Sequence, residues 1–309
     1  MNGLGGLLLV FFGLQMAIVY GLVYFVQSLQ VASNSDIISN IESLLNGVVS
    51  ATVFFLAGWI YCIMTRRSIA RLFPFERAGV KYIIILSIIG LAVTLMSNLV
   101  VDALSNVFGL FGIENRGIDM AEDGSLPSIL LYYLTVAVLP AFAEEFAFRG
   151  VVMGTLRKYS DSLALLVSSA AFALMHGNFV QIPFTFCCGL VFGYLVIKTN
   201  SLLPAIIVHF LNNALSVTAD LLTTYEIVPD YIVYAGYGVI FAICGVLALI
   251  FFKKLSQTDP DLFRLREKDT TIPFRDKVKA AASSPTMIAF AVLMILYAIY
   301  VLIMPYINV

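Results

Sequence analysis

Nine long apolar stretches, separated by short polar segments, account for most of this chain. Apolar runs of about twenty residues have the length that an α-helix needs to cross the hydrocarbon core of a bilayer. In chain order they cover residues 4–26, 48–64, 82–101 (with an amphipathic continuation to 108), 126–159, 163–175, 182–197, 204–222, 231–252 and 287–304. We therefore expect an all-α fold, a polytopic transmembrane helix bundle of about eight or nine spans.

The fourth stretch is the longest of the nine. A continuous helix from Leu126 to Tyr159 would be ~50 Å long. Because this exceeds the thickness of a bilayer core, we expect the helix to tilt, kink or project from the membrane. Pro140 is the predicted position of a kink. The polar stretch that contains Asp36 and Glu42, between the first two helices, is predicted to be a loop.

The composition agrees with a membrane protein, since 61% of the residues are hydrophobic and only 12% are charged. Soluble globular domains carry about 25% charged residues, so that class is excluded. The first basic residue is Arg66. The N-terminus therefore lacks the basic region of a cleaved signal peptide, and we expect the first helix to be retained.

Small residues inside the apolar stretches are interpreted as packing positions. The four cysteines lie in apolar runs without a CxxC spacing, which indicates neither a disulfide framework nor a zinc site. Gly189 and Gly193 form a GxxxG spacing, which we attribute to close helix packing rather than to dimerisation.

The polar segments alternate in the sign of their charge. Segments 66–81, 157–158 and 253–279 are basic, as is Lys198, whereas segments 36–42, 114–123 and 226–230 are acidic. The positive-inside rule then predicts a multi-pass protein with a cytoplasmic N-terminus and an external C-terminus. We divide the chain into N-terminal helices (1–125, about three spans), a central core (126–222, about four spans) and C-terminal helices (223–309), with a polar cytoplasmic or interfacial segment at 253–285.

The motif AEEFAFRG places Glu144, Glu145 and Arg149 in an otherwise apolar segment. Ionisable residues at membrane depth are energetically costly and usually mark a functional site. The chain contains two histidines, His176 and His209, and both also lie in apolar helices. Chance polar packing explains this combination poorly, so we predict one intramembrane catalytic cavity.

Helix geometry indicates how these residues meet. If the fourth and fifth helices turn at Ser160, then Glu144 and His176 lie at equal depth, ~24 Å from the turn, and can face each other. Glu145 and Arg149 are spaced i,i+4 and can form an ion pair on one helix face. Glu144 would then be free to act as a general base beside His176.

The seventh helix adds two hydrogen-bond donors on one face, His209 and Asn213, spaced i,i+4. Such donors can stabilise an oxyanion in a pocket with little water. Asn212, ~100° away around the helix, is a weaker candidate. Because this pair lies only two or three turns from Pro204, we expect the site to open to the cytoplasmic side. Phe172, one turn before His176, is expected to pack against the histidine ring.

Each feature also has a structural interpretation. Glu145 and Arg149 fit a purely structural ion pair, and an isolated His176 would fit a helix-end histidine bonded to a carbonyl. His209 with Asn213 fits interhelical polar packing, which is common in membrane bundles.

In chain order the motifs are EExxxR (Glu144, Glu145, Arg149), FxxxH (Phe172, His176) and HxxxN (His209, Asn213). This ordered set resembles the three motifs of the CPBP family, also called the Abi family. That family contains CAAX prenyl endopeptidases and bacteriocin-processing or immunity enzymes. The resemblance covers residues 126–222, and the sequence departs from it at no motif position.

The resemblance implies an intramembrane endopeptidase of the Ras-converting type. By this similarity Glu144 and His176 would activate water, His209 and Asn213 would hold the oxyanion, and Glu145 and Arg149 would shape the site. We expect no cofactor, because the histidines lie on separate helices and no HExxH motif is present. If the enzyme were zinc-dependent, the ligands would be Glu144, His176 and His209, an acceptable catalytic set.

Two other classes of function stay open at this point. The same polar cavity could serve a non-catalytic membrane protein that binds a peptide, lipid or partner in immunity or regulation. An ion-coupled transporter is less well supported, because such proteins ordinarily show internal repeats with broken helices. The expected partners of a peptidase are a peptide or protein substrate, either prenylated or a leader or signalling peptide, and the lipid bilayer. No nucleic-acid partner is expected.

Overall fold

A computed structural model of the chain describes residues 1–29, 35–66, 68, 79–110 and 124–307. Within these residues the fold is helical, and extended pairing is confined to an isolated bridge between Ser160 and Glu267. Seven of the described helices are long and apolar enough to cross a bilayer, and two further apolar stretches, Asn2–Ile18 and Asp161–Met175, are shorter. The predicted all-α polytopic bundle is confirmed.

One long composite helix, residues 126–156, occupies the interior of the bundle. It consists of α5 (Leu126–Tyr132), the π-helical stretch η2 (Tyr133–Val138), α6 (Leu139–Glu144), a second π-helical stretch η3 (Glu145–Met153) and α7 (Gly154–Leu156). The other helices are α1 (Asn2–Leu29), α2 (Ser35–Met64), α4 (Val80–Gly109), α8 (Asp161–Met175), α9 (Gln181–Thr199), α10 (Leu203–Thr224), α11 (Asp230–Thr258), α12 (Phe274–Ala282) and α13 (Pro285–Ile307).

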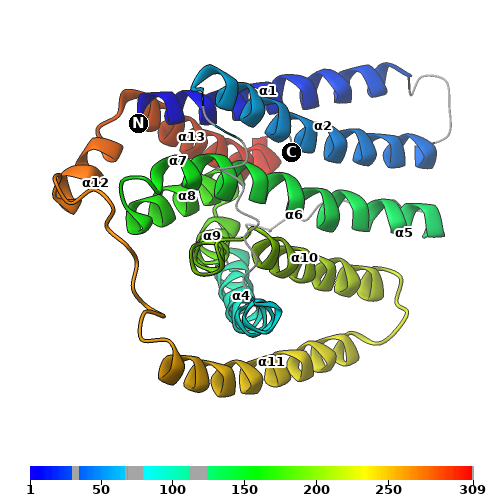
Figure 1. Ribbon diagram of the computed structural model, residues 1–309. Helices are drawn as coiled ribbons and strands as arrows, with labels where there is room; N and C mark the ends of the chain where they lie inside the picture. The colour runs from blue at the N-terminus through cyan, green and yellow to red at the C-terminus, as the bar shows by residue number, and fades with distance from the viewer. Residues whose placement is uncertain (30–34, 67, 69–78, 111–123, 308–309) are drawn as a thin grey trace.

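Figure 1 shows how these helices are layered. The pair α1 and α2 lies along one edge of the bundle with α13 beside α1, and α11 lies along the opposite edge. The composite helix packs against α2 on one side and against α8 and α10 on the other. Its η3 stretch is the most deeply buried part, since Phe148, Val151, Val152 and Met153 are at most 1% exposed. Any polar group on η3 is therefore held away from the protein surface.

Two predicted boundaries were wrong. The stretch with Asp36 and Glu42 is not a loop, because α2 already begins at Ser35. Ser and Asp are favourable at a helix N-terminus, where they can bond free N–H groups and oppose the helix dipole, and this signal outweighed the low hydropathy. Similarly, α11 does not stop at Phe252 but continues to Thr258. It ends where Asp259 precedes a proline, a context that disfavours the helical conformation.

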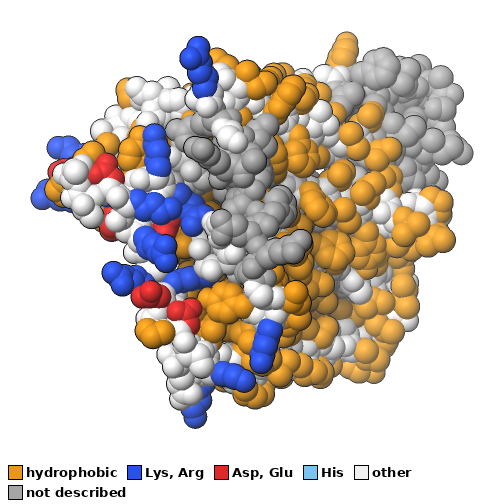
Figure 2. Space-filling view, in the orientation of Figure 1, with side chains coloured by type: hydrophobic (Ala, Val, Ile, Leu, Met, Phe, Trp, Pro, Cys, Tyr) orange, Lys and Arg blue, Asp and Glu red, His pale blue; other side chains and the backbone are white. Residues whose placement is uncertain are grey.

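The basic segments meet at one end of the bundle. Arg157, Lys198 and Arg264, from three of the predicted basic segments, line the same pocket. Figure 2 shows the basic and acidic side chains gathered along one edge, while most of the remaining visible surface is hydrophobic. The acidic segment 114–123 and most of the basic segment 66–81 lie outside the described residues.

The composite helix responds to Pro140 by changing its hydrogen-bond pattern. Proline has no N–H, so the carbonyl of Val136, four residues earlier, loses its usual helical partner. The helix is π-helical from Tyr133 to Val138, and the Asn213 side chain donates to the Val136 oxygen at 3.0 Å. Neighbouring side chains commonly satisfy backbone groups freed by proline within membranes. The structure thus has a π-helical stretch just before Pro140, the residue at which the sequence predicted a kink.

The polar segment after α11 is fastened to the α7–α8 turn. Ser160 caps α8 and donates its hydroxyl hydrogen to Glu267, while Lys277 on α12 donates to Glu267 at 2.9 Å and to the Tyr159 carbonyl at 3.2 Å. Burial raises the pKa of the Glu267 carboxyl, but the hydrogen bonds from Ser160 and Lys277 outweigh it and hold that pKa below its usual range. The turn before α8, which sets the depth of every residue on that helix, is thereby fixed.

Close contact between α8 and α9 depends on Gly189. A Cβ atom at this position would lie 2.9 Å from the Cα of Ser169, closer than real Cβ contacts. We expect Gly189→Ala to lower the free energy of unfolding by about 1–3 kcal/mol, the usual cost of overpacking. Gly13→Ala is the matched control, because nothing lies within 4 Å of its Cβ, and it should be neutral or slightly stabilising. Thermal unfolding in detergent measures both, and equal melting temperatures would contradict the prediction.

Candidate active site

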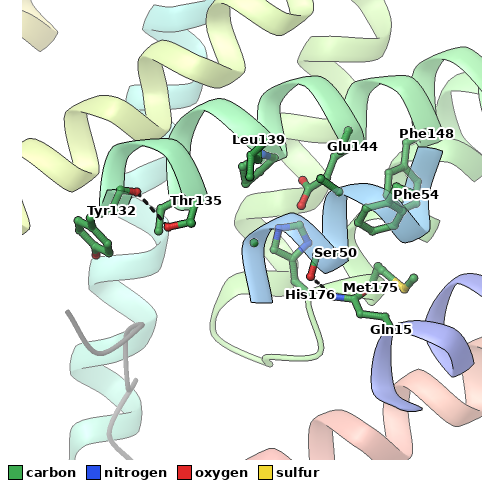
Figure 3. A pocket seen from close by; sticks show the side chains of 15 residues that line it. Gln15, Ser50, Phe54, Tyr132, Thr135, Leu139, Glu144, Phe148, Met175 and His176 are labelled. Atoms are coloured by element: carbon green, nitrogen blue, oxygen red, sulfur yellow. Dashed lines mark hydrogen bonds between the residues drawn. The ribbon is translucent and has the colours of Figure 1, made fainter. Parts of the chain in front are cut away.

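A cavity of about 320 Å³ lies between the composite helix, α2 and the end of α8. Its lining residues come from α1 and α2 (Gln15, Gly47, Ser50, Ala51, Phe54), from the composite helix (Tyr132, Thr135, Val136, Leu139, Pro140, Ala143, Glu144, Phe148) and from the end of α8 (Met175, His176). Figure 3 shows the side chains of Glu144 and His176 directed into this cavity from opposite helices. The two residues that the register placed at equal depth therefore line the same cavity.

The two adjacent glutamates lie in different environments. The Glu144 side chain is 19% exposed and lines the cavity, whereas the Glu145 side chain is fully buried. The cause is their position at the junction of α6 and η3, where successive residues point to different faces of the helix. Only Glu144 can therefore reach a molecule within the cavity.

His176 lies at the C-terminal end of α8, where Gly177 adopts a left-handed conformation with φ of 61°. Glycine takes this conformation without strain and ends the helix, which leaves the His176 ring at the cavity edge. Its Nδ1 bonds the Phe172 carbonyl at 2.9 Å. Since a carbonyl only accepts, Nδ1 carries the hydrogen and Nε2 is the nitrogen left for other partners. The Phe172 ring lies edge-on to the imidazole, with centroids 4.8 Å apart.

Glu145 joins two helices. Its Oε1 accepts from Arg149 Nη1 at 2.8 Å and from His209 Nδ1 at 3.0 Å. The other His209 nitrogen, Nε2, lies 3.8 Å from Oε2 of Glu144. The His209 ring also stacks on Phe192, with centroids 4.9 Å apart and planes 18° apart. His209 is therefore held between both glutamates, an arrangement that the sequence analysis did not predict.

Arg149 is 1% exposed and lies against aromatic rings. Its guanidinium carbon is 4.2 Å from the Phe172 ring centre and 5.2 Å from that of Phe192. Cations are attracted to the faces of aromatic rings, most strongly where water is excluded. Arg149 therefore connects Glu145 to the same two phenylalanines that contact His176 and His209.

Asn213 belongs to a chain of amides behind the cavity. Asn98 on α4 donates to Asn212 at 3.4 Å, Asn212 donates to Asn213 at 3.5 Å, and Asn213 donates to Val136. Asn98 could not be singled out from the sequence, because one asparagine in a long apolar helix belongs to no motif. The structure places Val136 on the cavity wall, so the Asn213 amide lies just behind that wall.

The predicted site residues therefore fall into two layers. Glu144 and His176 line the cavity, while His209 and Asn213 are not among its lining residues and contact it through Glu144 and Val136. Sequence reasoning also missed the opposite wall, where Gln15 on α1 donates to Ser50 on α2 at 3.4 Å. Within the described part of the chain, no group of three or more His, Cys, Asp and Glu side chains is arranged to hold a metal ion.

Comparison with known proteins finds similarity in this part of the chain. Residues 126–215 match the family model described as type II CAAX prenyl endopeptidase Rce1-like. This segment is therefore similar to that family. The matched segment holds Glu144, His176, His209 and Asn213, so every proposed catalytic residue lies inside the match.

A curated relative agrees with this assignment. The chain is 29% identical over 150 residues to the membrane-embedded CAAX protease MroQ of Staphylococcus aureus (strain USA300). The match covers 46% of this chain and 60% of that protein, so the chain spans about three fifths of its relative's length. No solved structure matches the chain. The resemblance to the CPBP family is thus confirmed, and the chain is a multi-pass membrane protein.

Proposed function

We propose that the chain is an intramembrane endopeptidase that hydrolyses a peptide bond in the manner of CAAX prenyl proteases. The observation that supports this most directly is the joint position of Glu144 and His176 on one cavity, within the residues that match the Rce1-like family model. A carboxylate and an imidazole on one cavity are groups that general acid–base hydrolysis can use.

In this proposal Glu144 takes a proton from a water molecule in the cavity. The hydroxide adds to the carbonyl carbon of the peptide, and the protonated Glu144 returns the proton to the leaving nitrogen as the C–N bond breaks. His176 orients the water through Nε2, because its Nδ1–H already donates to the Phe172 carbonyl. The bond to Phe172 thus selects the tautomer in which Nε2 accepts a hydrogen bond.

His209 and Asn213 are proposed to stabilise the oxyanion. The Asn213 amide has two N–H groups, and the contact with Val136 uses one of them. His209 donates Nδ1–H to Glu145 and, as an imidazolium with a hydrogen on both nitrogens, would also donate from Nε2, which faces Glu144. Donors fixed before the reaction lower the barrier because they need no reorganisation when charge develops. Glu145, Arg149 and Phe172 act as positioning residues that hold the two histidine rings.

The proposed mechanism uses no metal. We expect the hydrolytic rate to be unchanged after treatment with a zinc chelator and to gain nothing from added zinc. Elemental analysis of the purified protein should find less than one equivalent of zinc. A chelator-sensitive rate that zinc restores would contradict this prediction and would assign Glu144, His176 and His209 as ligands.

The proposed substrate is a membrane-associated peptide or protein, such as a prenylated C-terminal peptide or a leader or signalling peptide. The name of the relative MroQ supports the CAAX class. Gln15 and Ser50, opposite Glu144, are proposed to hydrogen-bond the peptide backbone. The predicted cytoplasmic opening is part of this proposal and can be tested by thiol labelling of cysteines introduced near the cavity.

The proposal is tested by incubating the full-length protein in liposomes with prenylated peptides and with leader peptides. Mass spectrometry of the products identifies the bond that is cleaved. The proposal is supported if the wild type cleaves either class of peptide and the Glu144→Ala variant cleaves neither. Binding of a peptide without cleavage under every condition would favour the non-catalytic immunity or regulatory alternative.

A further inference from the structure

A polar pocket of about 510 Å³, separate from the candidate active site, lies at the basic end of the bundle. Its ionisable lining residues are five cations (Arg157, Lys198, Arg264, Arg266, Lys268), three carboxylates (Asp161, Asp259, Asp261) and Tyr82. The cations exceed the carboxylates, so the formal charge of this pocket is positive. Such a pocket attracts an anion, and its position at the end of the spanning helices is that of a lipid headgroup.

The contacts within the polar pocket leave part of this positive charge available. Arg157 bonds Asp161 at 3.1 Å and the Asn200 side chain at 3.1 Å. Lys268 lies 3.7 Å from the same Asp161, which thus faces two cations. Lys198 instead donates to backbone carbonyl oxygens of the segment after α11, which carry no formal charge. A bound anion would neutralise the remaining positive charge of the pocket.

An apolar groove of about 360 Å³ lies beside the polar pocket, between α4, α9 and α11. It is lined by Leu86, Ile89, Gly90, Val93, Leu165, Leu190, Val191, Tyr194, Leu195, Phe252, Leu255, Leu262 and Phe263. The groove reaches the surface of the bundle, since Val93 is 40% exposed and Phe252 is 42% exposed. It is therefore open to the hydrocarbon region of a bilayer.

The pocket and the groove are consecutive along the same helix faces. On α4 the polar lining residue Tyr82 is followed one turn later by the groove residue Leu86. On α9 the groove residue Tyr194 precedes Lys198 by one turn. At the end of α11 the groove residue Leu255 precedes the C-cap residue Asp259, which lines the pocket, by four positions. Residues four apart lie on one helix face, so the two cavities are in line, polar at the end of the bundle and apolar toward its middle.

We propose that these two cavities form a binding site for one anionic phospholipid. Its phosphate lies among the cations of the polar pocket, near Arg266 and Lys268, and one acyl chain lies in the apolar groove. A soluble anion would contact only the cations, and a purely apolar ligand would contact only the groove. An anionic phospholipid contacts both. The bound lipid joins α9 and α11 through the segment that Lys198 holds, and so stabilises the outer helix α11.

The headgroup contact is tested by native mass spectrometry of the full-length protein in detergent. We expect one phosphatidylglycerol to be retained in preference to phosphatidylcholine with the same acyl chains. The double variant Arg266→Ala, Lys268→Ala should weaken retention roughly thirtyfold, the scale expected for two basic residues at an anionic headgroup. Lys253→Ala, Lys254→Ala is the matched control, because these exposed lysines on α11 lie outside the pocket. Equal retention of the two lipids, or equal loss in both double variants, would overturn the proposal.

The acyl-chain contact needs its own variant. Val93→Phe fills the groove and should also lower phosphatidylglycerol retention, whereas Leu99→Phe, exposed on α4 outside the groove, should not. Inorganic phosphate distinguishes a lipid from a free anion. If phosphate displaces phosphatidylglycerol at equal concentration and Val93→Phe has no effect, the pocket binds free anions and the lipid site is refuted. Failure of phosphate to compete, together with a Val93→Phe defect, supports the lipid.

Discussion

Replacing Glu144 with glutamine is expected to lower the rate of peptide hydrolysis by roughly 10²–10⁴-fold, the usual contribution of a general base. Glutamine has nearly the same size and still forms hydrogen bonds, but it cannot accept a proton from water. The Glu144 side chain is 19% exposed within a cavity, so the change leaves no buried charge without a partner. The variant should therefore fold, bind the peptide and release almost no product.

Single-turnover kinetics in liposomes measures this rate, and a thermal melt confirms that the variant is folded. Asp276→Asn is the control, since it removes an exposed carboxylate on α12 far from the cavity and should leave the rate unchanged. Turnover by Glu144→Gln at the wild-type rate would refute the assignment of Glu144 as the base. The same variant separates the two function classes, because a protein that only binds peptide would keep its function.

The position of Glu144 opposite His176 could be predicted because it depends only on where α8 begins and ends and on the rise per residue of a helix. Ser160 caps α8, α8 ends at the His176–Gly177 step, and the rise per residue of a helix is nearly constant. Depth in the bundle then follows from counting residues on either side of one short turn. The same reasoning succeeds for the pairing of Glu145 with Arg149, which lies within one helix.

The second layer of the site could not be predicted in this way. The bond between Glu145 and His209 joins residues 64 positions apart, and it depends on how α10 rotates against η3. The π-helical stretches change the angle between successive side chains, so a regular helical projection misplaces them. Gln15 and Ser50 were missed for another reason, because single polar residues in apolar helices carry no spacing that marks a cavity.

Removing the buried cation Arg149 is expected to have the largest effect on stability. In Arg149→Met, Glu145 stays fully buried and keeps only the contact with His209. Breaking one side of a buried ion pair typically costs about 3–5 kcal/mol, because the remaining charge has lost its compensation. We expect a large drop in melting temperature in detergent, whereas Arg275→Met, an exposed change on α12, should leave it unchanged.

The double variant Glu145→Gln, Arg149→Met decides which interaction causes this loss. If the uncompensated carboxylate is responsible, neutralising it should recover much of the stability, since buried ion pairs can often be replaced by uncharged residues. If the double variant melts as low as Arg149→Met, the loss instead arises from the guanidinium contacts with Phe172 and Phe192. Either result should leave peptide hydrolysis impaired, because Glu145 and both phenylalanines also hold His209. Recovery of stability without recovery of rate would therefore identify Arg149 and Glu145 as positioning residues of the site.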